Sequence, residues 1–140
     1  MNPANALLAG TAALLPLTGC QTFHADLSNE QIARKVHHRF DQDMTSEQVR
    51  EQLLKADLNE LQTWSQDDPQ HAVHAGDIGA ILWPKRMFYN GVNSAFNRDM
   101  LLFRFGGDDA LDDVIWRPFG WVPSAGDPLV IHLNDSEATP

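Results

Sequence analysis

Apolar residues recur at every fourth position early in the chain, at Ile32, Val36 and Phe40. This spacing places them on one face of a helix. The stretch opens with Ser28, and Gln31 stands three residues later. Ser followed three positions on by Gln is the capping-box pattern, in which each side chain satisfies a backbone N–H at the start of a helix. We therefore predict that a first helix begins directly after Ser28.

The same capping pattern returns at Thr45 and Gln48, just ahead of a second apolar stripe that starts at Val49. A second capped helix is therefore expected to follow Thr45. It either runs as far as Trp64 or breaks near residues 55–57 and restarts. Two consecutive helices with a short link form an αα-hairpin.

The second half of the chain changes to the two-residue alternation of β-strands. In the stretch 100–105, Phe103 falls on one face of a predicted strand and Arg104 falls on the other. Turn residues at 106–109 separate this strand from another apolar run at 114–117. We expect the two runs to pair as an antiparallel hairpin.

The remaining stretches have weaker patterns. Residues 71–79 are expected to form a loop, and β-structure is expected from Ala80 onward. Residues 129–133 are predicted to add a last, short edge strand. A helix pair followed by a run of strands is typical of an α+β fold.

A different pattern precedes these elements. The chain is apolar from Ala6 to Leu17 and has no charged residue before residue 20. An apolar run of about a dozen residues that ends in small ones is typical of a secretory signal and is too short to span a bilayer. Residues 17–20, Leu-Thr-Gly-Cys, resemble the lipobox of bacterial lipoproteins, and Cys20 is the only cysteine in the chain.

This resemblance implies that a signal peptide at 1–19 is removed and that the sulfur of Cys20 carries a lipid anchor. Two or more acyl chains hold a protein stably on a membrane. The chain then divides into the signal, the lipidated Cys20 with a spacer up to residue 26, an α+β domain at 27–134 and a tail at 135–140. One alternative stays open at this point, a buried thiol in an ordinary core helix.

The formal net charge of the chain is −9 at pH 7, and the uncharged signal contributes none of it. Nucleic-acid backbones require an excess of Lys and Arg, so an acidic domain argues against a nucleic-acid partner. It also argues against a charge-driven attachment to anionic lipid, so membrane attachment has to come from the acyl chains. A basic partner protein is compatible with this charge.

Sequence motifs for catalysis are missing. No Ser has the Gly-x-Ser-x-Gly setting of a nucleophile elbow, and the single thiol is assigned to the lipid. His71 and His74 have the spacing of a metal-ligand pair, but no cysteine accompanies them. The aspartates at 108–113 lack the alternation and closing Glu of a calcium loop. We predict a non-enzymatic protein without metal, cofactor or small-molecule substrate.

The aromatic residues offer a different kind of site. Trp83, Phe88, Tyr89 and Trp121 lie beside Pro and Gly in segments that have no regular pattern. Aromatic side chains held on loops often anchor a protein partner. These four are the predicted partner-binding residues, whereas strand aromatics such as Phe103 are expected in the core.

Two local patterns and the order of the elements resemble one known family. Residues 44–49 read Met-Thr-Ser-Glu-Gln-Val, and the hairpin between Leu102 and Val114 carries apolar residues around Asp108. With the lipobox ahead of them, these patterns resemble the SmpA/OmlA (BamE-like) family of small outer-membrane lipoproteins. The resemblance implies two helices packed on a small antiparallel sheet, in a domain that faces the periplasm and joins an outer-membrane protein complex.

We therefore expect an α+β fold, a two-helix hairpin packed on a small antiparallel β-sheet, after a cleaved lipoprotein signal peptide. The expected function is that of a membrane-anchored periplasmic adaptor or assembly factor with an envelope protein partner. A second class stays open, a tethered periplasmic inhibitor or immunity protein that blocks a toxin or hydrolase.

Overall fold

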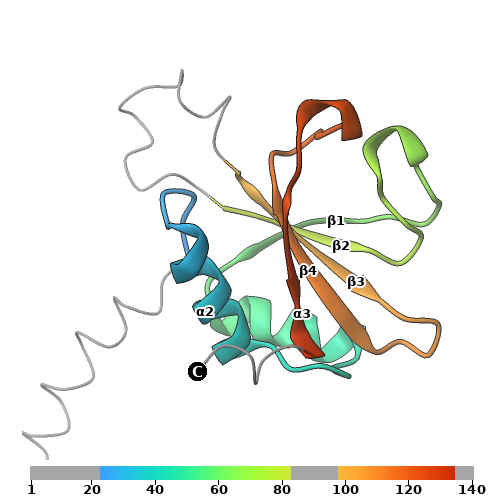
Figure 1. The fold of residues 1–140 in the computed structure, drawn as a ribbon. Helices are drawn as coiled ribbons and strands as arrows, with labels where there is room; N and C mark the ends of the chain where they lie inside the picture. Colours follow the sequence, from blue (N-terminus) through green and yellow to red (C-terminus); the bar gives the residue numbers. More distant parts are fainter. Residues whose placement is uncertain (1–22, 83–97, 135–140) are drawn as a thin grey trace, which may run out of the picture.

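Two helices lie on one face of a twisted antiparallel sheet in the computed structural model, which describes residues 23–82 and 98–134 (Figure 1). The strands neighbour one another in chain order, from β1 to β5, and every neighbouring pair is antiparallel. The α+β prediction is confirmed for this part of the chain. The elements are α2 (Asn29–Arg39), α3 (Ser46–Lys55), β1 (Asn59–Thr63), β2 (Ile78–Ile81), β3 (Met100–Phe105), β4 (Leu111–Arg117) and β5 (Leu129–His132), with short 3-10 turns η1 (Pro69–His71) and η3 (Pro123–Ala125).

Both helices begin with the predicted capping boxes. The Ser28 hydroxyl accepts a hydrogen bond from the Gln31 backbone N–H at 3.2 Å, and the Gln31 side chain accepts one from the Ser28 N–H at 2.9 Å. Thr45 and Gln48 repeat the arrangement at 3.2 and 3.0 Å. Each cap satisfies backbone donors that would otherwise lack partners at the helix start.

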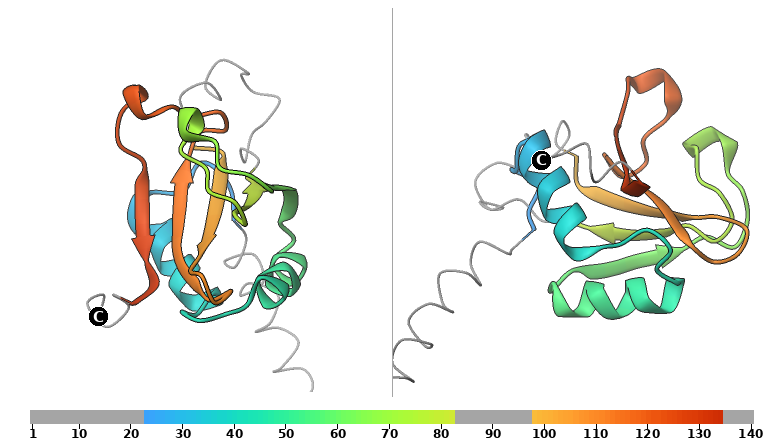
Figure 2. Two further views of the ribbon diagram at one scale, coloured as in Figure 1. Left: turned by 90° about the vertical axis from the view of Figure 1, so that its right-hand side faces the viewer. Right: turned by 60° about the horizontal axis from the view of Figure 1, so that its bottom comes forward.

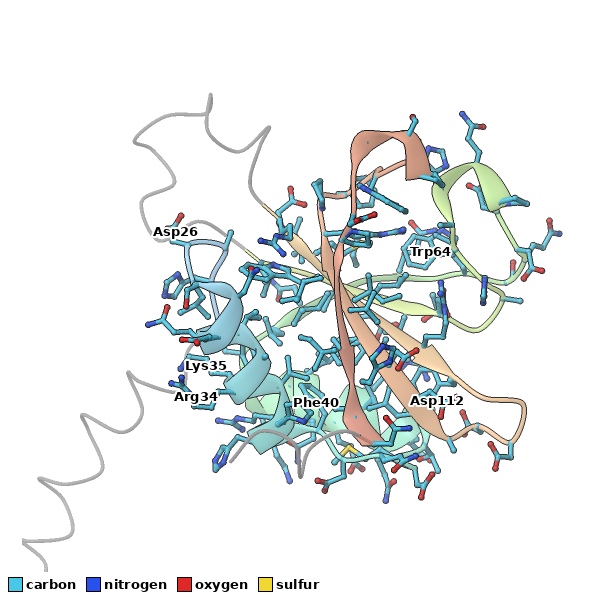
Figure 3. All side chains as sticks on the ribbon, in the orientation of Figure 1. Asp26, Arg34, Lys35, Phe40, Trp64 and Asp112 are labelled. Atoms are coloured by element: carbon cyan, nitrogen blue, oxygen red, sulfur yellow. The ribbon has the colours of Figure 1, made fainter. Side chains whose placement is uncertain are left out.

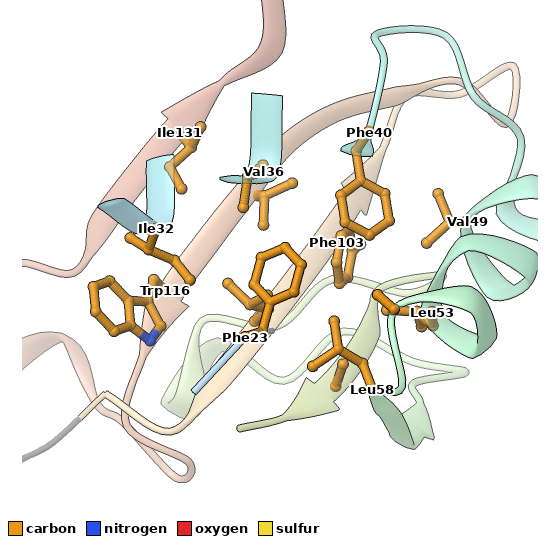
Figure 4. Close-up of a cluster of buried hydrophobic side chains, with 14 of the residues drawn as sticks. Phe23, Ile32, Val36, Phe40, Val49, Leu53, Leu58, Phe103, Trp116 and Ile131 are labelled. Carbon is orange, nitrogen blue, oxygen red and sulfur yellow. The ribbon is translucent and has the colours of Figure 1, made fainter. Parts of the chain in front are cut away.

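The helices and the sheet enclose the main apolar core between them (Figure 4). We call this side of the sheet the helix face. The rings of Phe40, at the end of α2, and Phe103, on β3, lie with their centroids 4.7 Å apart. Burial of each large apolar side chain contributes about 1.5–3 kcal/mol. Further buried members of this core are Ile32, Val36, Val49, Leu53, Leu58, Ile78, Leu101, Leu111, Val114, Trp116 and Ile131.

The folded part of the chain begins earlier than predicted. Phe23 and Ala25, assigned above to the spacer, are each only 6 % exposed and belong to the core on the helix face. Figure 4 shows Phe23 pointing into the centre of this core, beside Ile32 and Phe103. The predicted spacer up to residue 26 and the domain boundary at 27 are therefore corrected, because the described domain already includes residue 23.

The prediction for the second helix is correct in its first half only. α3 ends at Lys55, and Asp57 adopts a left-handed backbone with φ of 60°, which ends the helix. The chain then continues as the outer strand β1, whose five residues are all exposed. Of the two alternatives, the break near 55–57 is confirmed, but the segment after it is a strand and not a helix.

β1 is irregular, because its register with β2 shifts between Glu60 and Gln62. This irregularity has the form of a β-bulge, which bends and twists a strand locally. Arg50 on α3 holds the strand from outside: its Nε donates to Glu60 Oε2 at 3.3 Å and its Nη2 donates to Thr63 Oγ1 at 2.9 Å.

The predicted hairpin is confirmed as β3 and β4. Strand β4 starts three residues earlier than expected, at Leu111, and the edge strand predicted at 129–133 is present as β5, paired with β4. Strand β2 begins at Ile78, inside the stretch predicted as loop. The predicted signal at 1–19 and tail at 135–140 lie outside the described residues.

Candidate interaction surface

The face of the sheet opposite the helices is covered by two loops, at 64–77 and 118–128, and we call it the loop face. The right-hand view of Figure 2 shows both loops on one side of the sheet and the helix α3 on the other. A small apolar cluster lies beneath them, formed by Met100, Leu102 and Ile115 with Trp64 packed against it.

Gly79 on β2 makes room for Trp64. A Cβ atom at this position would lie 2.9 Å from Cζ3 of Trp64 and 3.2 Å from Sδ of Met100. The indole therefore lies directly on the strand backbone, an approach that only glycine allows. This contact holds the start of the 64–77 loop against the sheet.

A buried ion pair holds the other end of the same loop. Asp77 is 1 % exposed, and its Oδ2 accepts a hydrogen bond from Arg104 Nη2 on β3 at 2.8 Å. The same oxygen accepts one from the backbone N–H of His74, also at 2.8 Å. Arg104 Nη2 in addition donates to the carbonyl of Ala72 at 3.0 Å. The carboxylate thus fixes both the arginine and the turn at 72–77.

A second arginine lies under the loop, and it forms no salt bridge with a carboxylate of the described residues. Arg117 is 2 % exposed, and its Nη1 donates to the carbonyl of His71 at 2.7 Å. Burial lowers the pKa of the Arg117 guanidinium, Arg104 acts in the same direction, and Asp77 opposes both. Within the described part of the chain its Nε has no hydrogen-bond partner. The buried carboxylate of Asp77 therefore binds Arg104 directly and also favours the charged form of Arg117.

Trp121 completes the arrangement from the other loop. The guanidinium of Arg117 lies 5.4 Å from the centroid of its ring, within cation–π range. The indole N–H donates to the carbonyl of Gly126 at 2.9 Å, which closes the 118–128 loop on itself. Trp121 is half-buried. Its predicted place on an irregular loop is correct, and the structure adds a structural role for its ring.

Phe119, which is not among the predicted partner-binding residues, is the more exposed aromatic of this loop at 53 %. Its backbone N–H donates to Oδ1 of Asp99 at 2.6 Å, so the main chain beneath the ring is held in place. Burial raises the pKa of the Asp99 carboxyl above its ordinary value, against the effect of this hydrogen bond. Val130 on β5 is a further exposed apolar residue, at 38 %.

The other predicted site residues are not described. Cys20, Trp83, Phe88 and Tyr89 lie outside residues 23–82 and 98–134. The structure therefore leaves their assigned roles as predictions.

The histidine pair considered as a metal site is not arranged as one. His71 Nδ1 lies 2.9 Å from Oδ2 of Asp68, and this hydrogen bond lowers the pKa of the Asp68 carboxyl. His74 is exposed and contributes its backbone N–H to Asp77. The described residues contain no cluster of three or more side chains that could hold a metal ion.

An open groove lies on the helix side, along the link between α2 and α3. It encloses about 340 Å³ and is lined by polar and acidic side chains, Asp41, Gln42, Asp43, Gln48, Glu51 and Gln52, together with Met44. Carboxylates lining a groove attract basic groups, which agrees with the compatibility with a basic partner noted for the sequence.

No family model, no curated protein and no solved structure matches this chain. Across the two described ranges, no helix has the length and the hydropathy that crossing a bilayer requires.

Proposed function

We propose that this protein is a membrane-anchored periplasmic lipoprotein that acts as a non-catalytic adaptor or assembly factor in an outer-membrane protein complex, like the SmpA/OmlA (BamE-like) family that it resembles. The position of the lipobox cysteine carries the proposal. Cys20 stands three residues before Phe23, which packs in the core of the domain. A lipid on Cys20 holds that domain at a membrane surface.

The loop at 118–128 supports a role in protein contacts. Phe119 presents an exposed ring on a main chain that Asp99 holds, and Trp121 is fixed by Arg117 and Gly126. Aromatic anchors that are already held in position lose little conformational freedom on binding, which favours affinity.

The anchor is tested by Cys20→Ser in the organism that carries the gene, followed by separation of membrane and soluble fractions. We expect the wild-type protein in the membrane fraction, with a lipid-modified N-terminal cysteine by mass spectrometry, and the variant in the soluble fraction. Retention of the variant on membranes, or a native chain with an unmodified thiol, contradicts the proposal.

The partner is tested by affinity purification of the tagged protein from detergent-solubilised membranes. We expect an envelope complex to co-purify, and Phe119→Ala to reduce its recovery several-fold. Leu54→Ala is the matched control, because Leu54 is 80 % exposed on α3 and lies away from the loop face. Recovery of a toxin or hydrolase that loses activity on binding would instead favour the inhibitor or immunity class.

A further inference from the structure

The helix α2 is basic, although the protein as a whole is acidic. It holds three of the ten Lys and Arg residues, Arg34, Lys35 and Arg39, and one of the 19 acidic residues, Glu30. His37 and His38 add two side chains that become positive on protonation. The rest of the chain therefore carries a larger negative charge than the total of −9 indicates.

None of these basic side chains forms a salt bridge with another described residue. Among the described residues, the salt bridges are Arg50–Glu60, His71–Asp68, Arg104–Asp77 and His132–Asp113, and none involves α2. Figure 3 shows Arg34 and Lys35 on the outer side of α2, directed away from the sheet, with Asp112 on the far side of the molecule. The charges of Arg34 and Lys35 are thus presented outward.

The helix dipole explains only part of this charge. Cations are favourable within the last turn of a helix, and that accounts for His37, His38 and Arg39. Arg34 and Lys35 lie in the middle of the helix, where the effect of the dipole has faded. Neither the dipole nor a salt bridge among the described residues therefore accounts for the charges of Arg34, which is exposed, and Lys35, which is partly exposed.

The same side of the molecule is tied to the proposed lipid anchor. Two residues separate Cys20 from the buried Phe23, and the three steps of chain from Cys20 to Phe23 span at most about 11 Å when fully extended. The headgroup layer of a bilayer is about 5–8 Å deep on each side. The link therefore reaches at most about 6 Å beyond the headgroup layer. Because Phe23 itself lies inside the domain, the surface of the domain is held close to the headgroups.

We propose that the outer face of α2, formed by Arg34, Lys35 and His38, docks on negatively charged phospholipid headgroups. The inference rests on the lipid anchor of the proposed function and adds the orientation of the domain. An anionic surface attracts the basic helix and repels the acidic remainder, so the acidic turn between β3 and β4 points away from the membrane. The lipid supplies the attachment, and α2 selects which side of the domain faces the bilayer.

The orientation can be measured without relying on lipidation in the cell. The mature chain, residues 20–140, is coupled through Cys20, its only cysteine, to maleimide-bearing lipid in vesicles. One set of vesicles is phosphatidylcholine alone, and the other contains phosphatidylserine as well. A water-soluble acetylating reagent then reports the accessibility of each lysine by mass spectrometry. Lys35 on α2 is the probe, and Lys55, exposed at the end of α3, is the internal control.

We expect Lys35 to be acetylated several-fold more slowly on the phosphatidylserine vesicles than on phosphatidylcholine, with Lys55 unchanged. Added salt should remove the difference, because it screens surface charges over a distance of about 10 Å at 0.1 M. Arg34→Glu should abolish the protection of Lys35. Lys55→Glu changes the net charge by the same amount on another exposed helix position and should leave the protection intact.

Equal acetylation of Lys35 on both kinds of vesicle overturns the proposal, and so does protection of Lys55 instead. Protection that appears only after membrane proteins are added assigns α2 to a protein partner and overturns it as well. Failure of lipidation in the cell would show in the Cys20→Ser fractionation and not in the coupled vesicles, so failure of the anchor and failure of the orientation are distinguishable.

Discussion

The two faces of the sheet are closed by different kinds of interaction. On the helix face the buried side chains are apolar, from α2 and α3 through the sheet. On the loop face a smaller apolar cluster shares the surface with Asp77 and Arg117, both at most 2 % exposed. Apolar burial is non-directional, whereas buried ions require partners at defined positions. The helix face therefore supplies most of the stability, and the loop face fixes where the loops lie.

The largest effect is expected on the helix face. Phe103→Ala removes a fully buried ring that packs against Phe40, and the loss should be about 3–5 kcal/mol in the free energy of unfolding. Urea denaturation measures it. Leu54→Ala, on an exposed side chain, should stay within about 0.5 kcal/mol of the wild type. A loss of under about 1 kcal/mol for Phe103→Ala would show that this core is not well packed.

On the loop face, Asp77→Ala should lower the free energy of unfolding by about 3 kcal/mol. This is near the lower end of the loss for a broken buried ion pair, because Arg104 is partly exposed. The change also removes the charge of Asp77, which favours the charged form of Arg117. Hydrogen exchange should then speed up first in the 64–77 loop. Asp113→Ala is the control, since the side chain of its partner His132 is 53 % exposed, and should cost under about 1 kcal/mol. Equal costs would remove the distinction between the two pairs.

Gly79→Ala tests the contact between Trp64 and the sheet. The added methyl group would overlap the indole, so Trp64 has to move, at a cost of about 1–3 kcal/mol. Near-ultraviolet circular dichroism should report the changed environment of the ring. Gly107→Ala, where a Cβ meets no atom within 4 Å, should change neither signal nor stability. An unaltered spectrum for Gly79→Ala would mean that Trp64 does not lie on this strand.

The smallest effect concerns Asp99, whose carboxyl pKa is raised by burial. A carboxyl with a raised pKa in the folded state lowers stability as the pH climbs above the ordinary carboxyl pKa, because it then ionises more easily in the unfolded chain, and the cost is complete above the raised pKa. Asp99→Asn keeps an acceptor for the Phe119 N–H and removes this cost. The free energy of unfolding of the variant should be higher than that of the wild type by up to about 0.5 kcal/mol at neutral pH. The gain should vanish below the ordinary carboxyl pKa, and thermal unfolding across this pH range measures it.

The parts of the fold that depend on local signals could be predicted from the sequence. Ser28 and Thr45 cap helices through residues three positions away, so the pattern and the contact lie in the same short stretch. The β3–β4 hairpin follows from alternation on either side of a turn at 106–109. Predicting these features does not depend on residues elsewhere in the chain.

The parts that depend on distant partners could not be predicted. Strand β1 has only exposed residues and forms because β2 pairs with it after an intervening loop. Asp77 and Arg104 are 27 residues apart, and no periodicity links them. Phe23, Ala25 and Leu27 alternate with polar residues, but three apolar positions are too few to tell a buried segment from a spacer. For the candidate surface, the loop position of Trp121 was predictable and its contact with Arg117 was not.

The bulge in β1 affects how copies of this protein can meet. An outer strand offers its unpaired backbone groups to any neighbouring chain, and continuous strands of this kind zip together into aggregates. The register shift at Glu60 and Gln62 interrupts that row of groups, and Glu60 with Arg50 adds charge beside it. Under the proposed lipid anchor, copies of the protein would share one membrane surface and meet one another there. The interruption lets them crowd together without fusing edge to edge.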